Sequence, residues 1–211
     1  GHNESDDPRI TEVAHSAFLT ATDESGHRLA LEMASFSETL QFASQPDESV
    51  WVYRLYGKAF QGKVTLRLNS VVVGLAQAVP LTLDLRPFNF SFEQTPPGTP
   101  FKTGLIPLDL PDLSAQLYKA TVFHQGDLRG FELAFQADPR LEGIVFEVEV
   151  AGSGMSGSLR LPGGDLIAQV ATDPPPSMPF HLSATGLRLK GDWSLTWEPP
   201  APPPGATPFY A

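Results

Sequence analysis

Cysteine is absent from this 211-residue chain. Its absence excludes disulfide bonds, thiolate zinc sites and cysteine nucleophiles together. It does not by itself decide the cellular compartment, so other features of the sequence have to carry that inference.

Basic residues are scarce. The chain has 14 Lys and Arg against 24 Asp and Glu, which gives a formal net charge of −10. Nucleic acids and anionic lipid headgroups are bound by clustered basic side chains, and the sequence contains no basic run. We therefore expect no nucleic-acid partner.

Long hydrophobic runs are also missing. The longest candidate, residues 71–81, is interrupted by Gly74, Gln77 and Pro80, whereas a membrane-spanning helix needs roughly 18 consecutive apolar residues. We expect no membrane insertion by this part of the protein, and an anchor would lie outside it.

Helical periodicity is nearly absent, and alternation of apolar and polar residues takes its place. This alternation is typical of half-buried strands and occurs in residues 64–68, 81–85, 88–92, 145–150 and 193–197. The 21 prolines and 18 glycines cluster between these runs, at the spacing that β-sandwiches and barrels show. The sequence therefore predicts an all-β protein.

An internal repeat suggests two domains. Residues 17–33 form a strand–turn–strand pattern with Gly26 at the turn, and a similar pattern with Gly126 follows at 117–133. Each copy also ends on a pair of strand-like segments, at 66–70 with 80–83 and at 180–184 with 192–195. Shared alternation alone could produce such a match, but the same order of elements favours duplication.

We therefore predict two tandem immunoglobulin-like antiparallel β-sandwich domains, at residues 9–94 and 99–198. The proline-rich stretch 94–100 would link them, because proline cannot donate to a strand ladder. The glycine-rich stretch 152–164 would be a flexible insertion in the second copy.

The two ends of the chain are excluded from these domains. Residues 1–8 combine an apparent tag remnant, Gly1-His2, with a polar lead-in. Residues 199–211 are rich in proline and predict a polyproline II spacer toward an anchor or a further domain.

The candidate catalytic and metal-binding residues do not have the spacing that known motifs require. The histidines after the lead-in have none of the close spacings of zinc motifs; they are His15, His27, His124 and His181. Ser156 lacks a glycine two residues after it and so cannot form a nucleophile elbow. We expect no catalytic residue, metal ligand or cofactor site, and therefore no enzyme.

Pairs of carboxylates leave a glycosidase as an alternative, because such enzymes use two acidic side chains. The candidate pairs are Asp47 with Glu48, Asp109 with Asp112, and Glu147 with Glu149. The last pair is most simply the solvent face of one strand, since Val148 separates its members.

Aromatic residues divide into predicted core and predicted surface. Phe88, Phe90 and Phe92 share one face of an alternating run, and we expect them in a core; the same holds for Trp193 and Trp197.

The predicted ligand or partner surface consists of Trp51, Tyr53 and Tyr56. Trp51 and Tyr53 alternate with Val50 and Val52, so one of these two sets points away from a core.

A family resemblance comes from the closing strand. Residues 187–197 contain Gly191-Asp192-Trp193-Ser194-Leu195. This Gly-x-Trp-x-Leu pattern resembles the closing strand of extracytoplasmic β-domains in membrane-anchored anti-sigma-factor-like bacterial proteins. The matching segment of the first copy, residues 78–83, has no tryptophan. The resemblance implies an immunoglobulin-like fold, export and a sensory or scaffolding role, and it assigns no site residue.

Together these features predict a non-catalytic extracytoplasmic sensor or protein-interaction module of a bacterial envelope protein. Its partner would be a protein or a cell-envelope ligand, and no cofactor is expected. The alternatives are a carbohydrate- or cell-wall-binding module that uses Trp51, and a glycoside hydrolase.

Overall fold

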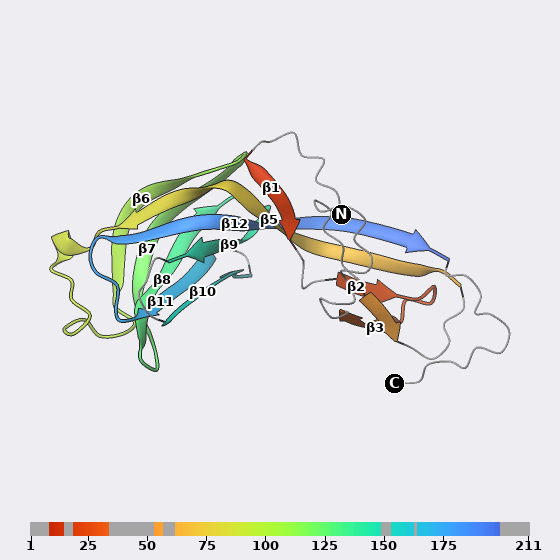
Figure 1. Ribbon diagram of the computed structural model, residues 1–211, viewed down its shortest axis with the longest axis horizontal. Coiled ribbons are helices and arrows are strands. Elements are labelled where there is room, and N and C mark those ends of the chain that lie inside the picture. Colours follow the sequence, from red (N-terminus) through yellow and green to blue (C-terminus); the bar gives the residue numbers. More distant parts are fainter. Residues whose placement is uncertain are drawn as a thin grey trace. The chain divides into compact units, whose positions relative to one another are not determined.

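The computed structural model describes residues 9–14, 19–33, 53–56, 62–148, 153–162 and 164–198. Within these residues the secondary structure is strand, apart from one 3-10 turn, η1 (Arg86–Phe88). The strands form two antiparallel sheets (Figure 1). The predicted all-β class is confirmed.

Twelve strands are described. They are β1 (Ile10–Ala14), β2 (Leu19–Thr22), β3 (Arg28–Met33), β4 (Tyr53–Tyr56), β5 (Val64–Leu83), β6 (Pro100–Leu110), β7 (Leu113–Gln125), β8 (Leu128–Ala137), β9 (Leu141–Glu147), β10 (Ser153–Arg160), β11 (Leu166–Asp173) and β12 (Phe180–Trp197). One sheet has the order β4-β3-β2-β5-β12-β9, with β1 also paired to β5, and the other has the order β10-β11-β8-β7-β6.

The chain forms two compact units that do not follow one another in sequence. Unit 1 comprises Gly1–Glu4, Val13–Val71 and Gly191–Ala211, and unit 2 comprises Ser5–Glu12 and Val72–Lys190. This division differs from the predicted boundary between residues 94 and 99. The physical reason is the length of β5 and β12, 20 and 18 residues, which lets each strand contribute to both units.

The predicted linker at 94–100 lies inside unit 2. There the Gly98 N–H donates to the Val122 carbonyl at 2.8 Å, the Val122 N–H donates to the Thr99 carbonyl at 3.0 Å, and Pro100 begins β6. The lead-in 1–8 and the tail 199–211 lie outside the described residues.

The two predicted hairpins are confirmed. The pairs of segments predicted at the end of each repeat copy, however, do not form separate strands. β2 pairs with β3 and β7 pairs with β8, with Gly26 and Gly126 in the left-handed conformation at the turns. Segments 66–70 and 80–83 belong to the single strand β5, and segments 180–184 and 192–195 to β12. These two strands are neighbours in one sheet.

The glycine-rich stretch was also expected to be a loop, and most of it is a strand. Residues 153–160 form β10, which pairs with β11 along all eight positions. The Ser158 hydroxyl bridges toward β9: it donates to the Ile144 carbonyl and accepts from the Ile144 N–H, both at 2.8 Å. The small side chains of β10 therefore allow this strand to lie close to β9.

The predicted strand at 88–92 is a turn. Pro87 stands inside η1, and Asn89 follows it with a left-handed φ of 53°. Proline restricts its own φ and removes a donor, so the alternation of Phe88, Phe90 and Phe92 does not become a ladder. Phe88 is 48% exposed, while Phe90 and Phe92 are half-buried and pack on Phe131 of β8.

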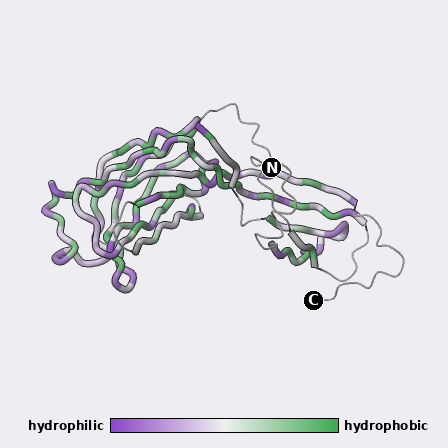
Figure 2. Tube along the Cα trace, viewed as in Figure 1, coloured by the Kyte–Doolittle hydropathy of each residue, from purple (hydrophilic) through white to green (hydrophobic). Residues whose placement is uncertain are grey.

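The core of unit 2 draws on both sheets. Ring pairs Phe135–Phe146 and Phe131–Phe180, with centroids 6.0 Å and 6.1 Å apart, join β8 to β9 and to β12. Along these strands hydrophobic residues are interspersed with polar ones, and the β7–β8 turn is hydrophilic (Figure 2). Each buried Phe or Leu contributes about 1.5–3 kcal/mol relative to an exposed one.

The core of unit 1 is smaller. Ala21, Leu29 and Val64 are buried in it, and four partly buried side chains pack against them, namely Leu31, Leu55, Leu66 and Trp197. The predicted core position of Trp197 is thus in accord with its packing, whereas Trp193 is 47% exposed.

Candidate functional site

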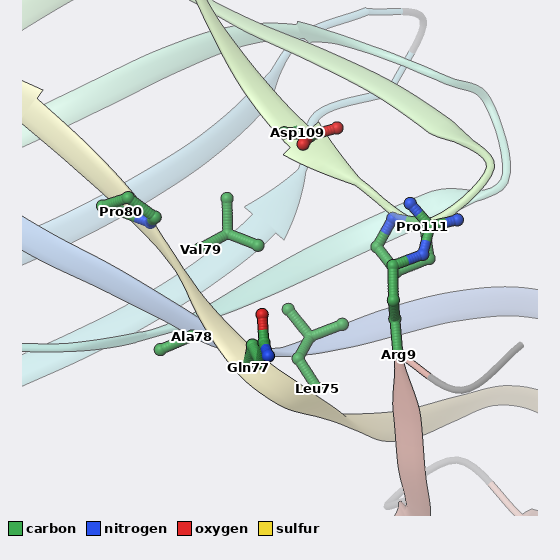
Figure 3. A pocket seen from close by; sticks show the side chains of 8 residues that line it. All are labelled: Arg9, Leu75, Gln77, Ala78, Val79, Pro80, Asp109 and Pro111. Atoms are coloured by element: carbon green, nitrogen blue, oxygen red, sulfur yellow. The ribbon is translucent and has the colours of Figure 1, made fainter.

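A groove in unit 2 is the candidate site (Figure 3). Its walls come from β5 (Leu75 and residues 77–80), from Asp109 near the end of β6 and Pro111 in the β6–β7 turn, and from Arg9 directly before β1. Its volume is about 190 Å³. Small-molecule sites occupy roughly 300–1,000 Å³, so this groove is of a size to take one or two side chains.

Backbone pairing sets the position of Arg9. The Ala76 N–H donates to the Arg9 carbonyl at 2.7 Å, which fixes the start of β1 beside β5. The Arg9 guanidinium lies 3.7 Å from an Asp112 carboxylate oxygen. Both side chains are well exposed, and an ion pair of this kind contributes little to stability. Its charges remain accessible at the rim of the groove.

The β6–β7 turn that carries Pro111 and Asp112 is held by the next turn. Arg140 donates to the Asp112 carbonyl at 2.9 Å and makes a two-point ion pair with Asp138, with nitrogen–oxygen distances of 2.9 Å and 3.0 Å. These contacts with Arg140, first its side-chain hydrogen bonds and then its backbone N–H, lower the pKa of Asp138 to about 2. Asp112 itself has a left-handed φ of 49°, so the turn is tight and its shape is well determined.

Arg160 organises the same end of unit 2 from β10. Its guanidinium donates to the carbonyls of Leu141, Gly164 and Asp138 at 2.8, 2.9 and 2.6 Å. Turn carbonyls need such donors when they are withdrawn from water. The role of Arg160 is therefore structural.

Tyr118 and Asp165 form a second polar contact in unit 2, on β7 and just before β11. The hydroxyl of Tyr118 donates to the carboxylate at 2.5 Å. This hydrogen bond, together with partial burial, raises the pKa of Tyr118 to about 12. At neutral pH the phenol stays protonated, so it can donate a hydrogen bond but not act as a base.

The described histidines do not form a cluster. His27 bonds to Asp23 at an exposed turn, and His181 bonds to the Thr82 hydroxyl at 3.1 Å. Nε2 of His124 is buried and has no hydrogen-bond partner among the described residues. Within the described part of the chain, no three His, Asp or Glu side chains lie together as metal ligands would. His15 lies outside it.

The predicted aromatic surface is only partly covered by the structure. Trp51 lies outside the described residues. Tyr53 and Tyr56 are the first and last residues of β4, opposite Met33 and Ala30 of β3. The prediction for their side chains stays a prediction.

Of the acidic pairs, only Asp109 with Asp112 reaches the groove. Asp109 lines it and Asp112 approaches Arg9 at its rim. Glu147 is exposed at the end of β9, while Glu149, Asp47 and Glu48 lie outside the described residues. Ser156, rejected as a nucleophile, lies within β10 opposite Val170.

Sequence reasoning missed Arg9 and Pro111 as site residues. The Pro111-Asp112 pair is an ordinary turn signal and could have located the β6–β7 turn. Nothing in the sequence places Arg9 against β5, because the two segments are more than sixty positions apart.

Comparison with known proteins gives no relative. No protein-family model, no curated protein and no solved structure matches the chain. Within its described part we also find no helix with the length and hydrophobicity that a membrane span requires.

Proposed function

We propose that this chain is a non-catalytic interaction module of a bacterial envelope protein, located outside the cytoplasm, that binds a polypeptide partner in the groove beside β5. The extracytoplasmic location is supported by the resemblance of residues 187–197 to exported β-domains. The observation that carries the binding role is the groove itself, which is small, partly apolar and rimmed by opposite charges.

We also infer that unit 2 is a β-sandwich of immunoglobulin-like kind. The support is the pair of ring contacts that join strands of the two sheets and the buried side chains on both. In such folds the turns at the ends of the strands commonly carry the binding surface, and the groove lies at one such turn.

The chemistry of the groove indicates the kind of partner. Leu75, Val79 and Pro111 offer an apolar wall, while the Arg9 guanidinium and the Asp109 carboxylate offer one charge of each sign. A peptide with an apolar side chain next to a charged one matches this arrangement. Extended peptides are often bound beside a strand, where backbone hydrogen bonds supply affinity and small pockets supply specificity.

A displayed library of random peptides tests the proposal. We expect selection on the purified chain to enrich a motif with an apolar residue adjacent to a charged one. Ala78→Arg should abolish binding of the selected peptides, because Ala78 is exposed and lines the groove. Ala30→Arg is the matched control, since Ala30 is exposed on β3 and does not line the groove.

Selected peptides that bind wild type, A30R and A78R equally would overturn the groove as the binding site, and so would a library that yields no motif. Circular dichroism spectra and melting temperatures close to wild type for both variants establish that they are folded. Binding to bacterial cell-wall polysaccharide that is lost in Trp51→Ala would replace the polypeptide partner with a carbohydrate.

A further inference from the structure

The two charged side chains that line the groove beside β5 differ in their surroundings. The Arg9 guanidinium already has an anion beside it, the Asp112 carboxylate at 3.7 Å. Asp109 is exposed near the end of β6, and its carboxylate makes no hydrogen bond or ion pair with any residue that the structure describes. Figure 3 shows this carboxylate apart from the Arg9 guanidinium. Of the two, Asp109 is therefore the charge that still lacks a partner.

The other basic side chains described at this end of unit 2 are directed elsewhere. Arg140 makes its two-point ion pair with Asp138, and Arg160 donates to the carbonyls of Leu141 and Asp138. Their donors already have acceptors within the fold. A bound partner can therefore supply the cation that Asp109 lacks.

The net charge favours a basic partner at longer range as well. Arg9, Asp109 and Asp112 together leave the groove and its rim with one positive and two negative charges, and the whole chain has a formal net charge of −10. Complementary charge speeds the approach of a partner, and like charge disfavours it. An acidic peptide would be repelled by both the groove and the surface around it.

The apolar wall of the groove strengthens this selection. Leu75, Val79 and Pro111 line a volume of about 190 Å³, which suits an apolar side chain. Such a side chain would displace water from the groove, and an ion pair beside it would be less screened than one in open solvent. A cation adjacent to the apolar residue would then gain most from Asp109.

We propose that the groove selects a basic peptide segment, in which an apolar side chain enters beside Leu75 and Val79 and a neighbouring Lys or Arg pairs with Asp109. Asp109 is then the specificity-determining residue of the site. The proposal rests on the function proposed above, because it names the sign of the charge that the polypeptide partner carries. Both carboxylate oxygens are available to a two-point pair with a guanidinium, so we expect arginine to be preferred to lysine.

Selection from the displayed peptide library, run in parallel on three proteins, tests the sign of the charge. We expect wild type to enrich an apolar residue next to Arg or Lys, and Asp109→Lys to enrich an apolar residue next to Asp or Glu. Asp127→Lys is the matched control and should enrich the wild-type motif. Asp127 is exposed in the β7–β8 turn and does not line the groove, and both substitutions change the net charge equally.

Binding of a selected basic peptide, made in soluble form, gives the size of the effect. Replacing its Arg or Lys by Glu should weaken binding to wild type about tenfold or more at low salt. Asp109→Asn should weaken binding of the basic peptide about threefold or more. Both differences should shrink at high salt, because the groove is open to solvent and its charges are screened.

Arg9→Gln separates this proposal from selection by Arg9. Removing the guanidinium leaves the carboxylates of Asp109 and Asp112 without that cation, so the basic peptide should bind more tightly than it does to wild type. If Arg9 chose the partner, wild type would instead enrich an acidic motif, and R9Q would lose it.

An acidic motif, a motif indifferent to the sign of charge, or the same motif from D109K and D127K would overturn the selection by Asp109 and leave the groove as a peptide site. So would weaker binding of the basic peptide to R9Q. A library without any motif, or peptides that Ala78→Arg does not block, would instead contradict the proposed function, and the selection would fall with it. Circular dichroism spectra and melting temperatures close to wild type establish that the variants are folded.

Discussion

The Tyr118 hydroxyl donates a 2.5 Å hydrogen bond to the Asp165 carboxylate, forty-seven residues along the chain. Tyr118 lies at an irregularity of β7, where the register with β8 shifts between Leu117 and Lys119. A β-bulge of this kind re-aims a side chain, and here it sends the phenol toward the start of β11. The bond therefore joins β7 to the β10–β11 turn of the same five-stranded sheet.

Removing this bond should cost stability with little change of structure. Tyr118→Phe keeps the ring and leaves a partly buried carboxylate without its donor, so we expect the free energy of unfolding to fall by about 1–2 kcal/mol. Chemical denaturation measures the loss. An unchanged unfolding free energy would show that water replaces the phenol without cost.

The same bond makes a prediction for alkaline pH. The pKa of Tyr118 is raised to about 12 from an ordinary value of 10.0, so the bond contributes its full stabilisation below pH 10 and loses it as pH rises toward 12. Ultraviolet titration of the four tyrosines should show one phenol ionising last. That late step should vanish in Tyr118→Phe, and a titration identical in both proteins would contradict the assignment.

The Asp138–Arg140 pair predicts behaviour in acid. Because Arg140 lowers the pKa of Asp138 from 3.8 to about 2, the carboxylate stabilises the folded state above pH 3.8, and that contribution is lost as pH falls toward 2. Asp138→Asn should lower the urea midpoint at pH 5 and reduce the difference between wild type and variant at pH 2. Since the pair also holds the Asp112 carbonyl, the variant should loosen the β6–β7 turn. A urea midpoint at pH 5 equal to that of wild type would contradict the stabilising role.

Much of the local structure could be predicted from the sequence, because alternation and turn residues act over short distances. The strand pattern and the hairpins around Gly26 and Gly126 follow from this. The extent of β5 could not be predicted, since its alternating pattern was divided into two segments, 66–70 and 80–83. Pro80 lies inside this strand and in the wall of the groove.

The pairing of strands far apart in the sequence could not be predicted. The similar patterns at 66–83 and 180–195 suggested two domains, yet β5 and β12 are neighbours in one sheet. Alternation records which face of a strand is buried but not which strand lies beside it. The groove could not be predicted for the same reason, because it requires Arg9 next to β5 and Asp109 beyond it.

We predict that His124 makes the fold sensitive to mild acid. Desolvation, together with the charge of Arg129 opposite it in the β7–β8 pair, lowers the pKa of His124 below 6.5. The unfolded chain therefore takes up a proton first, and stability falls as pH drops through 6.5. We expect His124→Gln to reduce the loss of melting temperature between pH 7.5 and pH 5. His27→Gln, at an exposed turn, controls for loss of a histidine, and an equal effect of both substitutions would contradict the prediction.

Two glycines of the five-stranded sheet should respond in opposite ways to alanine. A Cβ at Gly130 of β8 would lie 2.0 Å from the Val170 carbonyl oxygen and 2.5 Å from the Ala171 Cα. Both atoms belong to the backbone of the neighbouring strand β11, so relief requires the two strands to separate. Gly130→Ala should cost more than about 4 kcal/mol, at the extreme of single substitutions, or prevent folding.

Gly157 of β10 provides the matched control, because a Cβ there meets no described atom within 4 Å. Gly157→Ala removes backbone freedom from the unfolded chain, and we expect it to be neutral or to stabilise by up to about 1 kcal/mol. Urea denaturation of both variants measures the difference. If Gly130→Ala unfolds at the same urea concentration as Gly157→Ala, β8 and β11 are not packed as closely as described.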